Sequence, residues 1–170
     1  MAKKKAKKKT TKKKATKKTP AKGKADKVDK EARKAILKAV KEDGSALEHA
    51  DKIFKADREI VLAAVKQDGE ALEYADKSLK SDRDFMLKVL KQDELGWSFQ
   101  FADKTLKADR EVVLAAVKKN GWAFQFAAKS LKDDREFMLK VVQIKGAALE
   151  YAGKNLKADR EVVLKAVKQD

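Results

Sequence analysis

Residues 57 to 66 read Asp-Arg-Glu-Ile-Val-Leu-Ala-Ala-Val-Lys, and variants of this stretch occur five times in the chain of 170 residues. Each variant begins with Asp-Arg and has a Leu four residues after the Arg, and successive Asp residues are 25, 27, 25 and 25 positions apart. A fixed period of this length is typical of one small structural unit copied in tandem, in which each copy buries its apolar face against its neighbours. The repeated pairs are Asp57 and Arg58, Asp82 and Arg83, Asp109 and Arg110, Asp134 and Arg135, and Asp159 and Arg160.

Each copy is expected to contain two short helices. In the second copy the first helix is predicted over about 58–67, because Asp57 is a good N-cap and Asp68-Gly69 interrupts the apolar pattern. The second helix is predicted over about 70–80. The sequence therefore predicts an all-α fold, in which tandem two-helix repeats stack as a short α-solenoid. The copies span residues 32–56, 57–81, 82–108, 109–133 and 134–158, with a half copy over 159–170.

Two further features modify this regular pattern. A Gly recurs at the turn between the two helices, where it is expected to allow a positive φ or a close approach of neighbouring backbone. The copies also alternate, because residues 57–108 resemble 109–158 better than neighbouring copies resemble each other. This alternation indicates that a block of two copies was duplicated. The recurring glycines are Gly44, Gly69, Gly96, Gly121 and Gly146.

The first 24 residues differ in composition from the rest of the chain. They contain 13 Lys and no acidic residue, so they carry most of the formal net charge of +16. Such a segment cannot bury enough apolar surface to offset the entropy of ordering, so residues 1–26 are predicted to be a disordered basic tail. Residues 27–170 are predicted to form the helical repeat domain. Because no apolar run is long enough to span a bilayer, no integral membrane association is expected.

The repeated motif also resembles a known family. The string Asp-Arg-Glu-Val-Val-Leu-Ala-Ala-Val-Lys, a Gly turn, Ala-Leu-Glu-Tyr-Ala and a closing Leu-Lys-x-Asp is similar to the tandem repeat called domain of unknown function 4116. The resemblance covers residues 32–170. It implies a helical repeat fold, and it implies no activity.

All six arginines of the chain stand at one position of the repeat, directly after the place of the capping Asp. A ladder of guanidinium groups would suit phosphates, because the guanidinium fork makes paired contacts to oxyanions. The alternative role is structural. Arg58 opposes the helix dipole and has Val61 and Leu62, not carboxylates, three and four residues on. Because Arg58 shares a stripe with Leu62 and Val65, its stem is expected to lie over the core and its head to pair with an adjacent copy.

The outward face of the second helix changes in the two central copies. The second copy has Glu70, Glu73, Lys77 and Lys80 at four positions, whereas the central copies replace both acids by Trp and Gln. Aromatic rings beside lysines are suited to stacking on nucleobases or to anchoring a peptide. The alternative is that the two Trp cover the Gly turns and pack on each other. The residues of this patch, called here the central ridge, are Trp97, Gln100, Lys104, Lys107, Trp122, Gln125, Lys129 and Lys132.

The lysines of the tail are candidates for binding DNA or RNA without sequence specificity. Since each phosphate contact releases a counterion, 13 contacts give a salt-dependence slope of about −12 at the limit of roughly −0.9 per contact. Residues 13–25, Lys-Lys-Ala-Thr-Lys-Lys-Thr-Pro-Ala-Lys-Gly-Lys-Ala, resemble linker-histone tails and the histone H1-like proteins of bacteria. Alternative roles are solubility, nuclear localisation or attachment to anionic membranes. The candidate residues are Lys3, Lys4, Lys5, Lys7, Lys8, Lys9, Lys12, Lys13, Lys14, Lys17, Lys18, Lys22 and Lys24.

No arrangement of catalytic residues is recognised, so neither an enzyme nor a cofactor or metal site is expected. The single His49 stands where other copies have Tyr or Phe, and it is interpreted as a substitute for a half-buried aromatic residue. One functional hypothesis is a nucleic-acid-associated protein, histone H1-like or nucleoid-type, whose repeats provide a docking surface. The other is a protein-interaction scaffold, whose tail serves localisation or solubility. A monomer is expected inside the cell, in the cytoplasm or nucleoid of a bacterium or in the nucleus of a eukaryote.

Overall fold

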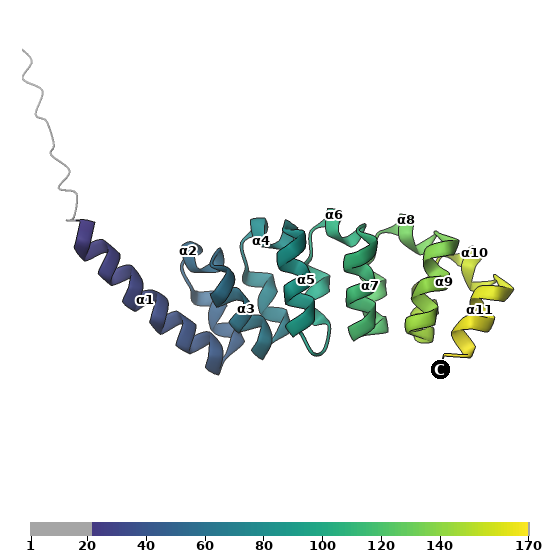
Figure 1. Ribbon diagram of the computed structural model, residues 1–170, viewed down its shortest axis with the longest axis horizontal. Coiled ribbons are helices and arrows are strands. Elements are labelled where there is room, and N and C mark those ends of the chain that lie inside the picture. The colour runs from purple at the N-terminus through teal and green to yellow at the C-terminus, as the bar shows by residue number, and fades with distance from the viewer. Residues whose placement is uncertain (1–21, 170) are drawn as a thin grey trace, which may run out of the picture.

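The computed structural model describes residues 22–169, with side chains described from residue 30 onward. These residues form eleven α-helices and five 3-10 helices, with no strand among them. The long helices stand side by side in a row, and the short α-helices follow one edge of that row (Figure 1). In chain order the elements are α1 (Lys22–Glu42), η1 (Gly44–His49), α2 (Lys52–Lys55), α3 (Arg58–Gln67), η2 (Gly69–Tyr74), α4 (Lys77–Ser81), α5 (Arg83–Gln92), η3 (Trp97–Phe101), α6 (Lys104–Lys107), α7 (Arg110–Lys119), η4 (Gly121–Phe126), α8 (Lys129–Lys132), α9 (Arg135–Ile144), η5 (Gly146–Tyr151), α10 (Lys154–Lys157) and α11 (Arg160–Val167).

The all-α tandem repeat fold is confirmed, and the long helix of the second copy has the predicted bounds. Asp57 caps α3, because its side chain accepts hydrogen bonds from the backbone N–H groups of Glu59 and Ile60. Asp68 then starts η2 by accepting from the backbone N–H of Glu70. The same capping of the long helix by Asp recurs at Asp82, Asp109, Asp134 and Asp159.

The prediction of one continuous second helix was wrong. A 3-10 helix and a short α-helix occupy this part of each copy, separated by residues with extended backbone such as Ala75 (φ −65°, ψ 153°). Two contacts stabilise the break. The side chain of Asp76 caps α4, and its backbone N–H donates to the carbonyl of Lys55 in the preceding copy, at 2.9 Å. A continuous helix would use that N–H internally, so the bond between copies requires the break.

The backbone hydrogen bond across the break recurs between successive copies. The N–H of Asp103 donates to the carbonyl of Lys80 at 3.0 Å, and that of Ala128 donates to Lys107 at 2.8 Å. The fourth such bond runs from Gly153 to Lys132, at 2.9 Å. Neighbouring copies are therefore joined by main-chain bonds as well as by apolar packing.

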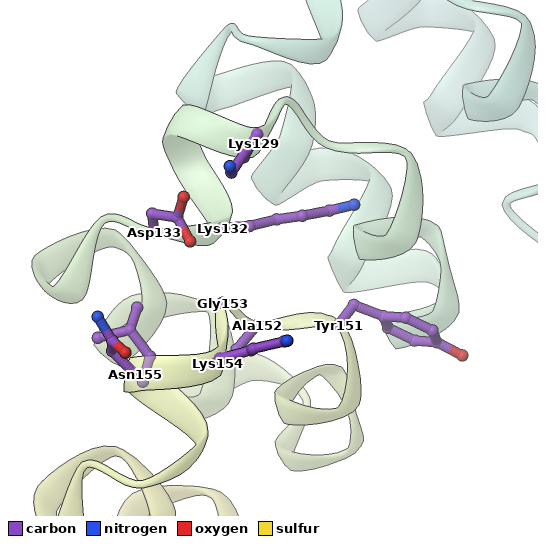
Figure 2. A pocket seen from close by; sticks show the side chains of 9 residues that line it. Lys129, Lys132, Asp133, Tyr151, Ala152, Gly153, Lys154 and Asn155 are labelled. Carbon is purple, nitrogen blue, oxygen red and sulfur yellow. The ribbon is translucent and has the colours of Figure 1, made fainter.

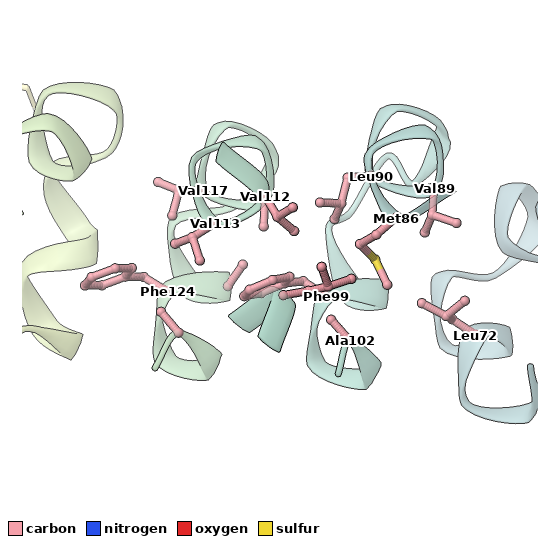
Figure 3. Close-up of a cluster of buried hydrophobic side chains, with 14 of the residues drawn as sticks. Leu72, Met86, Val89, Leu90, Phe99, Ala102, Val112, Val113, Val117 and Phe124 are labelled. Atoms are coloured by element: carbon pink, nitrogen blue, oxygen red, sulfur yellow. The ribbon is translucent and has the colours of Figure 1, made fainter. Parts of the chain in front are cut away.

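The core lies between the layer of long helices and the layer of 3-10 helices. Met86 and Leu90 of α5 and Val113 of α7 point toward the 3-10 layer, where Phe99 and Phe124 meet them (Figure 3). All five side chains are at most 1% exposed. The apolar residues at helical spacing in the sequence thus form one continuous core that runs from copy to copy.

The first helix includes part of the predicted tail. α1 starts at Lys22 and ends at Glu42, so residues 22–26 belong both to this helix and to the segment assigned to the tail. The long helix of the first copy is also longer than in the other copies, because no Asp stands at Ala32 to start a new helix. The predicted disorder of residues 1–21 lies outside the described residues.

Only one of the recurring glycines needs a positive φ. Gly96 has φ 75°, whereas the turn glycines elsewhere in the described chain have ordinary backbone angles. Close packing explains Gly44, because a Cβ there would lie 2.6 Å from the carbonyl oxygen of Ala64 in the next copy. The close approach of neighbouring backbone therefore explains Gly44, and the need for a positive φ explains Gly96.

No helix within residues 22–169 combines the length and the apolar composition that crossing a membrane requires.

Candidate functional site

The arginines after the capping positions join each copy to the next. Every arginine from Arg33 to Arg135 donates a hydrogen bond to the capping Asp of the following copy. For Arg83 and Asp109 the distance from Nε to Oδ2 is 2.8 Å. Each carboxylate thus caps its own long helix and pairs with the arginine of the preceding copy. This pairing was expected, because Arg58 shares a stripe of its helix with apolar residues. Arg160, in the half copy, makes no such pair within residues 30–169.

The second partner of each arginine alternates along the row. Arg83 also donates to Glu111, two residues beyond its capping partner. Arg58 instead lies over the ring of Phe85, with 5.3 Å between the guanidinium carbon and the ring centroid. Every following helix has an acid in its first turn, so the next position distinguishes the two cases. Where that position is an aromatic residue, at Phe85 and Phe137, the arginine lies over the ring. Arg33 and Arg135 follow the pattern of Arg83, and Arg110 follows that of Arg58.

The capping carboxylates have lowered pKa values. At Asp82 and Asp134 the main cause is the backbone N–H of Phe85 and Phe137 respectively, and the nearby arginines add to the effect. At Asp159 the hydrogen bond from Arg135 is the largest cause. These carboxylates therefore stay ionised at neutral pH. Since the guanidinium groups already bind carboxylates, the geometry favours a structural role for the ladder over phosphate binding.

The two Trp of the central ridge contact each other. Trp97 begins η3, Trp122 lies at the second position of η4, and their ring centroids are 4.8 Å apart with 61° between the planes. Trp122 also meets the ring of Phe126 edge to face, at 4.9 Å. Both indole side chains are half-buried. The rings thus pack on each other, as one interpretation expected, and part of each remains accessible to solvent.

Two lysines of the central ridge are turned back onto the array. Lys107 Nζ donates to the carbonyl of Gln100 at 2.6 Å and lies 5.8 Å from the ring centroid of Phe126. Lys132 makes the equivalent bond to the carbonyl of Gln125. Partial burial lowers the pKa of both ammonium groups. These contacts occupy one donor of each amine and restrain its position.

The central ridge is therefore not a single helical stripe. Trp and Gln belong to the 3-10 helices, and the lysines belong to the short α-helices after the break. Lys104 and Lys129 begin α6 and α8 and are exposed, whereas Gln100 and Gln125 are half-buried. The structure places the aromatic part on the 3-10 layer and the free ammonium groups on the edge formed by the short helices.

The insertion in the third copy is built around a buried carboxylate. Asp93 is 2% exposed and accepts hydrogen bonds from the backbone N–H groups of Leu95, Gly96 and Ser98, at 2.7–3.1 Å. The equivalent Asp68 accepts only one backbone N–H. The extra residues Glu94 and Leu95 therefore form a loop that wraps around Asp93. Sequence reasoning gave no role to this residue, although the insertion directly after it is a visible signal.

Most of the tail lysines lie outside the part of the chain that the structure describes. These are the eleven lysines between residues 3 and 18. Lys22 and Lys24 fall within α1. The predicted role of the tail in binding nucleic acid thus rests on its composition.

A pocket between the fourth and fifth copies was not predicted. It has a volume of about 820 Å³. Lys129, Lys132 and Asp133 lie on one side of it and Tyr151, Lys154 and Asn155 on the other (Figure 2). In the sequence, the pocket coincides with several positions at which the fourth and fifth copies differ from the others.

The fold and these contacts define a class of protein, the tandem α-helical repeat proteins, in which each copy packs on its two neighbours. The chain belongs to the family described as Domain of unknown function (DUF4116), whose family model matches residues 33–80, 82–132 and 134–170. The first two matched segments each span two of the copies defined here, so the family unit contains two copies. Searches of curated proteins and of solved structures found no match.

Proposed function

We propose that the protein is a non-enzymatic nucleic-acid-associated protein, whose N-terminal lysines bind the phosphate backbone of DNA or RNA without sequence specificity. The observation that carries the proposal is the presence of 13 Lys and no acidic residue among the first 24 residues. At this charge density counterion release dominates the binding free energy, and it does not depend on base sequence. The proposed compartment is accordingly the nucleoid of a bacterium or the nucleus of a eukaryote.

The repeat array would supply a second surface, centred on the central ridge. η3 and η4 contain no acidic residue, whereas η2 contains Glu70 and Glu73, and η5 contains Glu150. The removal of acids lowers the repulsion that a nucleic acid would meet at this part of the array. The half-buried Trp97 and Trp122 would then offer accessible ring surface on which unpaired bases could stack.

The proposal is tested with the full chain and with a variant in which the eleven lysines of residues 3–18 are replaced by Gln. Fluorescence anisotropy with duplex DNA and with RNA, over a series of salt concentrations, gives the slope of log K against log salt. We expect the replacement to reduce this slope by up to about 10, at roughly 0.9 per lost contact. If the full chain shows no salt-dependent binding at low ionic strength, the proposal is wrong.

A second candidate function is a protein-interaction scaffold. It is favoured by Leu95, which is 65% exposed in the loop before Trp97 and adds an apolar side chain to the aromatic part of the central ridge. The double variant Trp97→Ala plus Trp122→Ala separates the two functions. Weaker binding to RNA in this variant would implicate the ridge in nucleic-acid binding. Unchanged binding would show that the central ridge does not bind RNA and serves a protein partner or packing instead.

A further inference from the structure

The pocket between the fourth and fifth copies carries more positive than negative charge. Lys129 and Lys154 are exposed at the starts of α8 and α10, and Lys132 lies between them in sequence. Asp133 is the single carboxylate among the lining residues. Figure 2 shows the lysines on both sides of the pocket, so a bound group would have ammonium groups on two sides. An anion is the ligand that this arrangement favours.

The loss of two acids produces this charge. In the first three copies an Asp precedes the first Lys of the short helix, at Asp51, Asp76 and Asp103. The fourth and fifth copies have Ala128 and Gly153 instead. The backbone has not changed, because Ala128 (φ −58°, ψ 146°) and Asp76 (φ −60°, ψ 146°) have nearly the same conformation. An Asp would therefore fit at residue 128, and its absence leaves Lys129 without the directly preceding carboxylate that Lys52, Lys77 and Lys104 have.

A carboxylate is gained at a different point of the same pocket. Asp133 replaces the small residues Ala56, Ser81, Ala108 and Ala158 of the other copies. A Cβ at Gly153 would lie 2.0 Å from Asp133 Oδ1, so the Gly makes the space that this carboxylate occupies. The changes at residues 133 and 153 are thus matched to each other.

We propose that this pocket binds a small molecule that carries a phosphate group and a nearby hydroxyl group, as a sugar phosphate does. Lys129 and Lys154 are suited to the phosphate, because ammonium groups make charge-assisted hydrogen bonds to its oxygens. The carboxylate oxygens of Asp133 accept hydrogen bonds, so they are suited to a hydroxyl donor on the same ligand. The volume of about 820 Å³ is within the range of small-molecule sites. This proposal does not rest on the nucleic-acid function.

The first test uses ribose 5-phosphate as the probe. To remove competition from the tail, isothermal titration calorimetry is done on the full chain with the eleven lysines of residues 3–18 replaced by Gln. We expect saturable binding that weakens about tenfold in Lys129→Gln and in Lys154→Gln. The matched controls are Lys52→Gln and Lys77→Gln, which remove lysines that follow Asp51 and Asp76, and these should bind as the parent does. Absence of saturable binding, or equal weakening in the controls, would overturn the proposal.

Two further variants examine the carboxylates. Ala128→Asp restores the acid of the other copies and should weaken ribose 5-phosphate binding severalfold without lowering thermal stability, so unfolding cannot explain the loss. Asp133→Asn should weaken ribose 5-phosphate binding but not the binding of inorganic phosphate, which has no sugar hydroxyl. Equal effects on both probes would refute the role given to Asp133.

A last comparison identifies the source of the phosphate. A single-stranded oligonucleotide is titrated in parallel with ribose 5-phosphate and with unphosphorylated ribose. Binding of ribose 5-phosphate but not of ribose supports the proposal. Binding of the oligonucleotide alone, with dependence on Lys129 and Lys154, would overturn it in favour of a nucleic-acid contact.

Discussion

At the scale of single residues, Asp93 differs in burial and in hydrogen bonding from the equivalent Asp68 of the second copy. Its side chain is buried and accepts three backbone N–H groups, whereas the equivalent Asp68 is exposed and accepts one. A buried carboxylate is tolerated when its oxygens are well supplied with donors. Its removal would leave the loop amides unpaired in a buried site, which costs more than the loss of an exposed cap.

Asp93→Ala should therefore lower the free energy of unfolding by about 3 kcal/mol. Asp68→Ala, at the equivalent position of the second copy, should cost about 1 kcal/mol, which is typical of a lost cap. Chemical denaturation of both variants, analysed with a common m value, gives the comparison. Equal losses would show that the three hydrogen bonds to Asp93 stabilise the protein no more than the single bond to Asp68 does.

The ion pairs of the arginines contribute less to stability than the burial of apolar side chains does. The arginine side chains are 38–51% exposed, so solvent screens each ion pair with the next copy and its contribution to stability is small. The pairs specify which surface of a copy meets the next one more than they stabilise the array. Burial of residues such as Phe99, which is fully buried, supplies the larger share.

At the scale of the element, the short α-helices differ in their caps. α4 and α6 begin after Asp76 and Asp103, whose side chains accept the backbone N–H of Ser78 and Thr105. α8 has no side-chain cap, because Ala128 stands at this position. A helix of four residues has little stability of its own, so its cap and its packing determine whether it forms.

Ala128→Asp should stabilise the protein by about 0.5–1 kcal/mol, because the new carboxylate can accept from the backbone N–H of Ser130 as Asp76 does from Ser78. The gain is measured as a higher midpoint of thermal unfolding. Ala128→Asn, which caps without a charge, serves as the control and should give a similar gain. A loss of stability in both variants would mean that the backbone at residue 128 does not accept a cap.

At the scale of the whole molecule, each copy contacts its immediate neighbours. α3 packs on α1 and α5, and the same pattern continues to α11, which packs on α9 and η5. Stability in such an array is close to a sum of local and nearest-neighbour contributions. In the described chain α11 is covered on one side, and its Val167 is 69% exposed, whereas the equivalent Val117 of α7 is fully buried.

Amide hydrogen exchange should therefore be faster in α11 than in α7. We expect a difference of at least about tenfold, because α11 can open without disturbing the inner copies. Mass spectrometry of peptides from the two helices, taken from the same exchange reaction, gives the ratio. Equal protection in both would show that the array unfolds as one cooperative unit.

Much of this architecture can be predicted from the sequence, because it depends on local and periodic signals. The bounds of α3 follow from the cap at Asp57 and the turn at Asp68-Gly69. The buried stripe, with Val61 and Val65, follows from the 3.6-residue period. The break at Ala75 could not be predicted in this way. A hydrogen bond to Lys55 of the preceding copy stabilises it, and that bond exists only when the copies are stacked.

The candidate sites, like the fold, could be predicted only in part from the sequence. Sequence comparison of the copies found both Trp of the central ridge, but only the coordinates show that their rings meet edge to face and that Lys107 is turned back onto Gln100. The pocket at Lys129 and Lys154 was missed, because its two sides come from different copies. The changes at residues 128, 133 and 153 are visible in the sequence, yet nothing there shows that they surround one space.

The sequence by itself determined the all-α class, the number of copies, the buried faces and the position of the basic tail, because period, caps and charge are properties of short stretches of chain. The tertiary structure decided where the second helix breaks, which partner each arginine takes and which residues enclose a pocket. These depend on distances between copies, and a hydrogen bond or a shared cavity between copies forms only after they have stacked.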